Sequence, residues 1–369
     1  MKKLVCLVVG LYMLFTCYEC FALELSAASA VIIDGDCGAI IYGKDENNRR
    51  TMASTTKIMT AICALEEGNL ERKVKIAPEA VGVEGSSIYL RNGEELTLRE
   101  LTYGLMLNSG NDAAVAIAIA VSGSVENFAK LMNKKALEIG VENTGFKNPN
   151  GLDEEGHYTT ASDLARITAY AMKNEEFRKI VSTYQTTIPS GEDNAVRYLT
   201  NHNKLLKRME GCIGVKTGFT KKSGRCLVSA AERNGVVLVA VTLNAPDDWN
   251  DHIKMMDYGF ERVEKKQMCS KGEFLQDIAV QGGVKKKAKV VCKRDFSVSM
   301  VSDRCYTSLY KFAGSIKAPL EKGKRVGDVE LFMGDTLIGT VPAVIDEAVE
   351  EDKTRHFDMS FEKILKEYF

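Results

Sequence analysis

Met52-Ala53-Ser54-Thr55-Thr56-Lys57-Ile58-Met59-Thr60-Ala61 is the stretch around which the chain is organised. In this stretch a serine stands three residues before a lysine, at the start of an apolar run of helix-forming residues. Residues three apart lie on one face of a helix, so Lys57 can reach the hydroxyl of Ser54. A helix N-terminus also offers unpaired N–H groups and a partial positive charge, which favour a developing oxyanion. The pattern predicts that Ser54 is a nucleophile and Lys57 its base.

The composition indicates an ordinary folded protein. The chain has 369 residues, of which 45% are apolar and 27% charged, and this length is sufficient for two domains. Its net charge is −1 and it contains no long basic block, so a nucleic-acid partner is not expected.

The first 22 residues read as a secretory signal peptide. Lys2 and Lys3 precede an apolar run from Leu4 to Phe15, and small residues near Ala22 offer a cleavage site. An uncleaved membrane anchor is the alternative, although the run is short for a span. Either reading predicts export to the outer face of the cytoplasmic membrane, or to the cell wall or periplasm.

The cysteine count argues against a complete disulfide framework. Three of the ten cysteines belong to the leader, and the remaining seven cannot all pair within one chain. Most are expected to be buried free thiols.

Periodicity divides the rest of the chain into three parts. Region 23–263 begins with a hairpin over 29–43, continues with mostly helical segments, and ends with an antiparallel meander from about 211 and a helix over 248–260. Region 264–347 reads as a small β domain. Region 348–369 reads as an amphipathic helix, which either lies on a membrane surface or packs on its own domain.

Two further polar clusters accompany the serine and lysine. Ser109 and Asn111 lie in a polar break between two apolar helical segments, where the bland alternative is an N-cap. Lys216, Thr217 and Gly218 end an apolar strand, where an extended peptide could pair and a cation could attract a carboxylate. The Ser-x-x-Lys pattern recurs at 308–311 and 360–363, so only its companions single out the copy at 54–57.

Together the three clusters match the Ser-x-x-Lys, Ser-x-Asn and Lys-Thr-Gly set of the penicillin-binding proteins and class A β-lactamases. The chain resembles a low-molecular-mass penicillin-binding protein, a serine D-alanyl-D-alanine carboxypeptidase, from about residue 29 to residue 260. The resemblance includes the stretches 86–90, 150–153, 160–165 and 201–206. It implies an α/β (α+β) fold: a β-lactamase/transpeptidase-like antiparallel sheet with a helical insertion, followed by a small all-β C-terminal domain.

The resemblance also implies a mechanism of acyl transfer without a cofactor or metal. The substrate would be a peptidoglycan stem peptide ending in D-Ala-D-Ala, and β-lactam antibiotics would mimic it. Ser54 and Lys57 would be catalytic, and Ser109 would pass a proton to the leaving amine. The peptide would bind to Asn111 and to the segment 216–219, with the Ser54 and Phe219 N–H groups holding the oxyanion.

Two positions depart from patterns seen in some relatives. Phe219 stands where some relatives carry histidine, and His202 stands where some carry arginine, both on the carboxylate side of the expected cleft.

Several alternative functions remain. A DD-endopeptidase with the same residues is the second hypothesis, and a serine β-lactamase is the third. Two hypotheses come from other classes of protein, a zinc peptidase and a non-enzymatic wall-binding protein. The zinc peptidase is disfavoured because the four histidines show no His-x-x-x-His pair.

Overall fold

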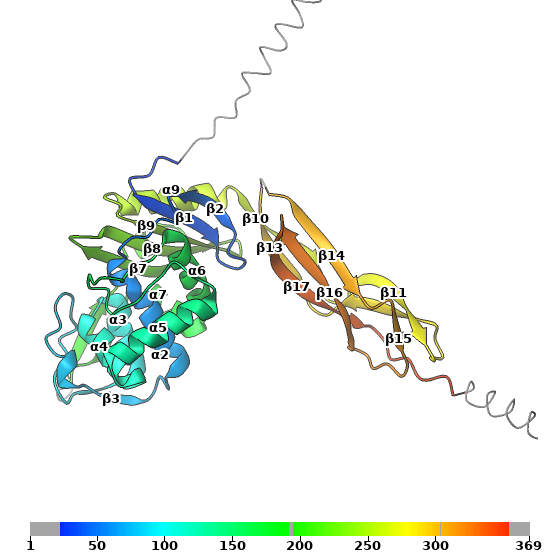
Figure 1. Cartoon of the computed structure of the whole chain (residues 1–369), viewed down its shortest axis with the longest axis horizontal. Helices are drawn as coiled ribbons and strands as arrows, with labels where there is room; N and C mark the ends of the chain where they lie inside the picture. Colours follow the sequence, from blue (N-terminus) through cyan, green and yellow to red (C-terminus); the bar gives the residue numbers. More distant parts are fainter. Residues whose placement is uncertain (1–22, 192–194, 303, 354–369) are drawn as a thin grey trace, which may run out of the picture.

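The computed structural model describes residues 23–191, 195–302 and 304–353. Figure 1 shows two bodies, one that combines a sheet with helices and one built from strands, which join where α9 (Asp248–Phe260) leads into β10 (Val263–Cys269). The predicted signal peptide lies outside the described residues, as does the predicted C-terminal helix beyond residue 353.

Five antiparallel strands form the sheet of the first body, in the order β2-β1-β9-β8-β7. The predicted hairpin and meander are therefore confirmed, and β1 pairs with β9 across the whole helical insertion. The strands are β1 (Ser29–Asp34), β2 (Ile40–Lys44), β7 (Cys212–Thr220), β8 (Gly224–Arg233) and β9 (Val236–Leu243).

Strand alternation sorts the apolar residues of this sheet onto two faces. Val31 and Ile33 of β1 face the helical insertion. Ile32 lies on the other face, in the apolar cluster that contains Met255 and Met256 of α9. Both faces are covered, so all six residues of β1 are buried.

The helical insertion is built around α2, whose residues from Lys57 to Ala64 are buried. The mostly helical character predicted for this part of the chain is confirmed, and α3 begins at a capping box formed by Thr97 and Glu100. The helices are α2 (Lys57–Glu67), α3 (Leu98–Leu107), α4 (Asn111–Ser122), α5 (Val125–Ile139), α6 (Ala161–Met172), α7 (Glu175–Ser182) and α8 (Leu205–Arg208).

Short elements complete this body. Two of them are 3₁₀ turns, η1 (Ala53–Thr56) and η2 (Pro78–Ala80). The others form two hairpins, one of β3 (Lys73–Lys75) with β4 (Glu95–Thr97) and one of β5 (Gln185–Pro189) with β6 (Val196–Thr200). The sequence analysis did not identify β5 and β6, because their polar residues give only a weak period of two.

The C-terminal body is all β, as predicted. It contains a six-stranded sheet in the order β14-β16-β17-β12-β11-β15 and the antiparallel pair β10 and β13. The strands after β10 are β11 (Phe274–Gln281), β12 (Lys287–Cys292), β13 (Phe296–Val301), β14 (Tyr306–Phe312), β15 (Ser315–Lys317), β16 (Arg325–Met333) and β17 (Thr336–Ile345).

The structure corrects the start of the predicted C-terminal helix. Residues 348–353 are not helical, because Val349 and Glu351 form β-bridges with Leu320 and Gly283. The β domain thus continues past residue 347. Within the described part, no single helix is long and apolar enough to cross a membrane, although the bent pair α4 and α5 together passes that test of length and composition.

The seven cysteines of the described part are free thiols, and most of them are buried, as expected. Cys212 and Cys226 do not face each other, since their strand partners are Ala231 and Gly218.

Candidate active site

Ser54 lies in the turn η1, directly before α2. The hydroxyls of Thr55 and Thr56 donate hydrogen bonds to the carbonyls of Met52 (2.6 Å) and Ala53 (2.8 Å), which fixes the turn in place. The predicted position of the serine at a helix start is therefore confirmed. The two competing Ser-x-x-Lys copies differ, since 308–311 lies in strand β14 and 360–363 lies outside the described residues.

The amine of Lys57 is buried against three oxygen atoms. Its Nζ lies 2.9 Å from Ser54 Oγ, 2.7 Å from Asn111 Oδ1 and 2.6 Å from the Asn150 carbonyl oxygen. The side chain is fully buried, so these three oxygens satisfy the amine in place of water.

The three contacts determine what Lys57 can do when it is neutral. A neutral amine has two hydrogens and one lone pair. The Asn111 and Asn150 oxygens can only accept, so they take the two hydrogens. The lone pair is then left for the Ser54 hydroxyl, which is the one neighbour of the three with a proton to give.

The electrostatic surroundings favour this neutral form. Burial lowers the pKa of Lys57 well below its usual value of 10.5, and the nearby positive charge of Lys216 lowers it further. The carboxylate of Asp112 acts in the opposite direction. Lys57 is thereby suited to accept a proton near neutral pH.

Gly151 brings the Asn150 carbonyl to the lysine. Its φ of +90° lies in the left-handed region, and a Cβ there would stand 2.0 Å from the Ala53 carbonyl oxygen. Only glycine fits this contact with the nucleophile turn. The stretch 150–153 belongs to the resemblance to the family, but its residue types alone do not predict this role for a backbone carbonyl.

Asn111 begins α4 and connects the lysine to a neighbouring loop. Its backbone N–H donates to the Ser86 carbonyl (2.7 Å), and its side-chain Nδ2 donates to the Glu84 carbonyl. The amide is therefore oriented with its oxygen toward Lys57. Ser109 stands just before it with a φ of +60°, a conformation uncommon for serine.

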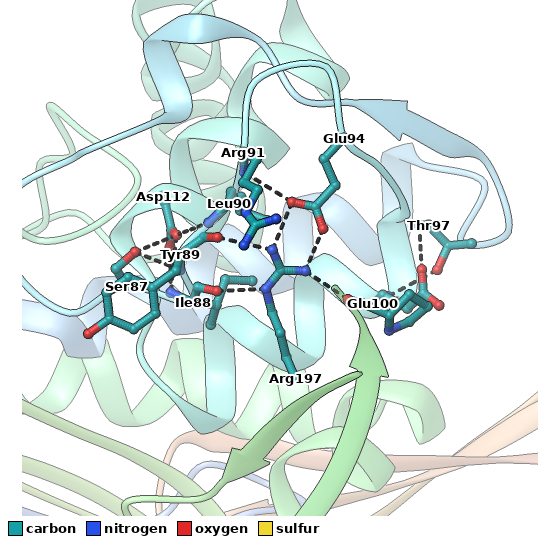
Figure 2. A network of polar contacts seen from close by, with 11 residues as sticks. Ser87, Ile88, Tyr89, Leu90, Arg91, Glu94, Thr97, Glu100, Asp112 and Arg197 are labelled. Atoms are coloured by element: carbon teal, nitrogen blue, oxygen red, sulfur yellow. Dashed lines mark hydrogen bonds and ion pairs between the residues drawn. The ribbon is translucent and has the colours of Figure 1, made fainter. Parts of the chain in front are cut away.

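The next residue, Asp112, holds the loop that borders the site. Its carboxylate accepts hydrogen bonds from Ser87 Oγ (2.6 Å), the Ile88 N–H (3.0 Å) and the Leu90 N–H (3.1 Å). Figure 2 shows these bonds converging on the carboxylate, with the Tyr89 ring directed away from it. The sequence analysis missed Asp112, although its position beside Asn111 was a usable signal.

Arg197 of the β5–β6 hairpin fixes the same loop from the other side (Figure 2). It donates to the carbonyls of Ile88 (2.8 Å) and Tyr89 (3.0 Å) and forms an ion pair with the buried carboxylate of Glu94. Two charged side chains from distant parts of the chain thus define one wall of the site.

Strand β7 forms the opposite wall. A Cβ at Gly218 would lie 3.0 Å from the Ser54 nitrogen, so the glycine lets the strand pack against the nucleophile turn. Lys216 is almost completely buried and donates from Nζ to the Thr217 carbonyl (3.0 Å). Burial lowers the pKa of Lys216 to about 7. Phe219 is exposed.

A cleft of about 390 Å³ lies between the two walls. Five of the predicted residues line it, namely Ser54, Ser109, Thr217, Gly218 and Phe219, whereas Lys57, Asn111 and Lys216 lie behind them. The structure therefore brings together residues from three distant segments, as predicted. The cleft is also lined by Ser86, His202, Lys204, Arg225, Asp248 and Trp249.

Comparison with known proteins now identifies the family. Residues 18–247 match the family described as D-alanyl-D-alanine carboxypeptidase. The chain belongs to this family. Residues 264–351 match a second family, described as the C-terminal domain of penicillin-binding protein 5.

Individual relatives agree with the family match. D-alanyl-D-alanine carboxypeptidase DacF of Bacillus subtilis is 34% identical over 336 residues, covering 88% of this chain and 86% of that protein. A D-alanyl-D-alanine carboxypeptidase of a Streptomyces species is 35% identical over 64% of this chain and 88% of its own length. The crystal structure of penicillin binding protein 5 from Haemophilus influenzae, 27% identical, has a TM-score of 0.71 and covers 89% of this chain and 98% of its own.

This protein is a serine D-alanyl-D-alanine carboxypeptidase, with the penicillin-binding protein fold that the sequence predicted. The family acts on peptidoglycan stem peptides that end in D-Ala-D-Ala, binds β-lactams and is associated with the bacterial cell wall.

The substitution Gly151→Ala tests whether the Asn150 carbonyl positions Lys57 in this carboxypeptidase. The added Cβ collides with the Ala53 carbonyl, so the turn that carries Ser54 has to shift. We expect the rate of covalent labelling by a fluorescent penicillin to fall at least about tenfold, because a displacement near 1 Å is costly for a positioned nucleophile.

Gly140→Ala is the matched control. Its φ of +84° imposes similar backbone strain, but no heavy atom lies within 4 Å of the added Cβ. Both variants should lose about 1 kcal/mol of stability from the left-handed backbone. Gly151→Ala should lose more because of the collision with Ala53, and only Gly151→Ala should lose labelling. Equal labelling by the two variants would refute the positioning role.

Proposed function

We propose that this carboxypeptidase removes the terminal D-alanine of peptidoglycan stem peptides through an acyl-enzyme on Ser54, with Lys57 as general base. The observation that carries the proposal is the set of three oxygens around the buried Lys57 amine, which leaves its lone pair for the Ser54 hydroxyl. The lowered pKa of Lys57 supports the same role.

Acylation begins when Ser54 Oγ attacks the carbonyl carbon of the penultimate D-alanine and its proton passes to Lys57. The backbone N–H groups of Ser54 and Phe219 stabilise the oxyanion, a role supported by the close packing of Gly218 against the Ser54 nitrogen. The carbon–nitrogen bond then breaks, and the proton held by Lys57 reaches the departing amine through the Ser109 hydroxyl, so that both side chains regain their starting protonation. Water adds to the ester and restores the Ser54 hydroxyl.

Substrate binding uses the two walls of the cleft. The peptide lies beside β7, where the remaining Nδ2 hydrogen of Asn111 donates to a peptide carbonyl. Thr217, with Lys216 behind it, receives the terminal carboxylate. β-Lactams enter the same cleft as substrate mimics and acylate Ser54.

D-alanine release from a pentapeptide ending in D-Ala-D-Ala tests the nucleophile. Ser54→Ala is expected to reduce release at least about a thousandfold, because removing a nucleophile removes the covalent route. Ser308→Ala is the control, since Ser308 belongs to the Ser-x-x-Lys copy in strand β14 and should leave the rate unchanged. Equal release by wild type and Ser54→Ala would contradict the proposal.

The pH dependence of acylation tests the base. A protonated Lys57 cannot accept a proton, so kcat/KM should rise with pH and reach its plateau well below pH 10.5, because the pKa of Lys57 is lowered. Lys57→Arg keeps a positive charge that cannot be lost, so acylation should fall by about a hundredfold or more. A plateau reached only near pH 10.5, or an active Lys57→Arg enzyme, would disprove the assignment.

We further infer export and the division of the chain into a leader (1–22), a peptidase domain (23–263), a β domain (264–347) and an amphipathic tail (348–369). The β-bridges of Val349 and Glu351 extend the β domain a few residues further. The tail carries an apolar stripe at helical spacing, which includes Phe361 and Leu365 and suits a membrane interface.

Co-sedimentation with anionic vesicles tests the tail. The double substitution of Phe361 and Leu365 by glutamate should abolish binding, because it breaks the apolar stripe. Glu362→Gln on the polar side is the control and should bind at least as well as wild type. Failure of the unmodified protein to sediment would exclude a membrane role for the tail.

A further inference from the structure

The substrate carboxylate needs a cation, and the predicted one is not in the cleft. Lys216 is 1% exposed, and its Nζ is directed to the Thr217 carbonyl. Because its pKa is about 7, its charge is also incomplete at neutral pH. Lys216 is therefore buried beneath the surface of the cleft and carries only part of a positive charge at neutral pH.

His202 does not replace it. This residue lines the cleft. Burial lowers the pKa of His202 below 6.5, and the charge of Lys216 lowers it further. The lowered pKa leaves the imidazole with less positive charge for an anion at neutral pH than an ordinary histidine carries.

Arg225 supplies a permanent positive charge at the same wall. It lies on β8 directly opposite Phe219 of β7, and residues directly opposite in an antiparallel pair point to the same face. Strand alternation places Thr217 on that face as well. The guanidinium lines the cleft, remains 43% exposed and is charged at every physiological pH.

The position of Arg225 is fixed by α9. Its Nε and Nη2 donate to Asp248 Oδ1 at 3.0 and 2.7 Å, and its guanidinium lies 5.7 Å from the Trp249 ring centre. Asp248 is buried in the first turn of α9, where the helix N-terminus shares in stabilising its negative charge. Nη1 and one hydrogen of Nη2 are left to donate into the cleft.

Lys204 is the other cationic side chain that lines the cleft, but its position is less well defined than that of Arg225. It is exposed on the loop before α8, and an ammonium on a flexible stem binds a carboxylate with less geometric definition than a guanidinium fork. Arg225 is therefore the better defined carboxylate donor, and Lys204 offers a matched comparison.

We propose that Arg225, held by Asp248, binds the C-terminal carboxylate of the substrate beside Thr217 and makes the enzyme selective for peptides with a free carboxyl terminus. This proposal rests on the proposed function and deepens it. It assigns to β8 and α9 a recognition role that the three motifs do not contain.

The test compares two peptides that differ only at the carboxyl terminus, one ending in D-Ala-D-Ala and one in D-Ala-D-alaninamide. Arg225→Gln should lower kcat/KM for the free acid by about ten- to a hundredfold, which is the range for a lost charge-assisted hydrogen bond. For the amide, kcat/KM should change less than about threefold. The variant therefore loses the preference for the free acid.

Two further variants make the result specific. Lys204→Gln also removes one positive charge from the cleft and should keep the preference. Arg225→Lys keeps the charge and a partner for Asp248, and should restore part of the preference. Unlike a purely structural role, recognition of the carboxylate predicts a changed ratio between the two peptides.

The outcomes separate the two claims. Equal losses on both peptides for Arg225→Gln, or an unchanged preference, would overturn the role of Arg225. Absence of Ser54-dependent release from either peptide in the wild type would instead contradict the proposed function, and the role of Arg225 with it.

Discussion

The buried amine of Lys57 is the interaction on which the active site depends. A charged group without water is costly, so burial favours the neutral form of the amine with its hydrogens satisfied by oxygen acceptors. Its three oxygen partners come from η1, from the start of α4 and from the turn at Gly151. Three segments that are far apart in the sequence thus meet at one nitrogen atom.

Around this amine, a small set of residues holds the walls of the cleft in place. Asp112 and Arg197 fix the loop over 86–90 from opposite sides, and Gly218 allows β7 to lie against the nucleophile turn. Asp248 likewise fixes Arg225, which lies on β8 next to β7. In each case a buried carboxylate or a missing side chain positions a group that faces the cleft.

The sequence predicted the parts of the site that depend on residue type and spacing. Ser54 and Lys57 are three residues apart, and the structure joins them directly; Ser109, Asn111 and Lys216 to Phe219 are gathered around them as expected. It could not predict the Asn150 carbonyl, because a backbone oxygen has no residue type and its direction depends on the conformation of Gly151. Arg225 was missed for a related reason, since its partner Asp248 becomes a neighbour only when β8 and α9 pack. In the fold, a clear helical period identified α9, whereas the polar hairpin β5–β6 gave too weak a pattern.

The clamp of Asp112 and Arg197 has a thermodynamic consequence for ligand binding. The loop they hold includes Tyr89 in a left-handed conformation, with a φ of +59°, that would be poorly populated in a free loop. The entropy of ordering this wall is lost once, when the chain folds, and not again at each encounter with a ligand. A ligand of this cleft therefore meets a wall that is already ordered, and its binding energy is not reduced by the cost of ordering that wall.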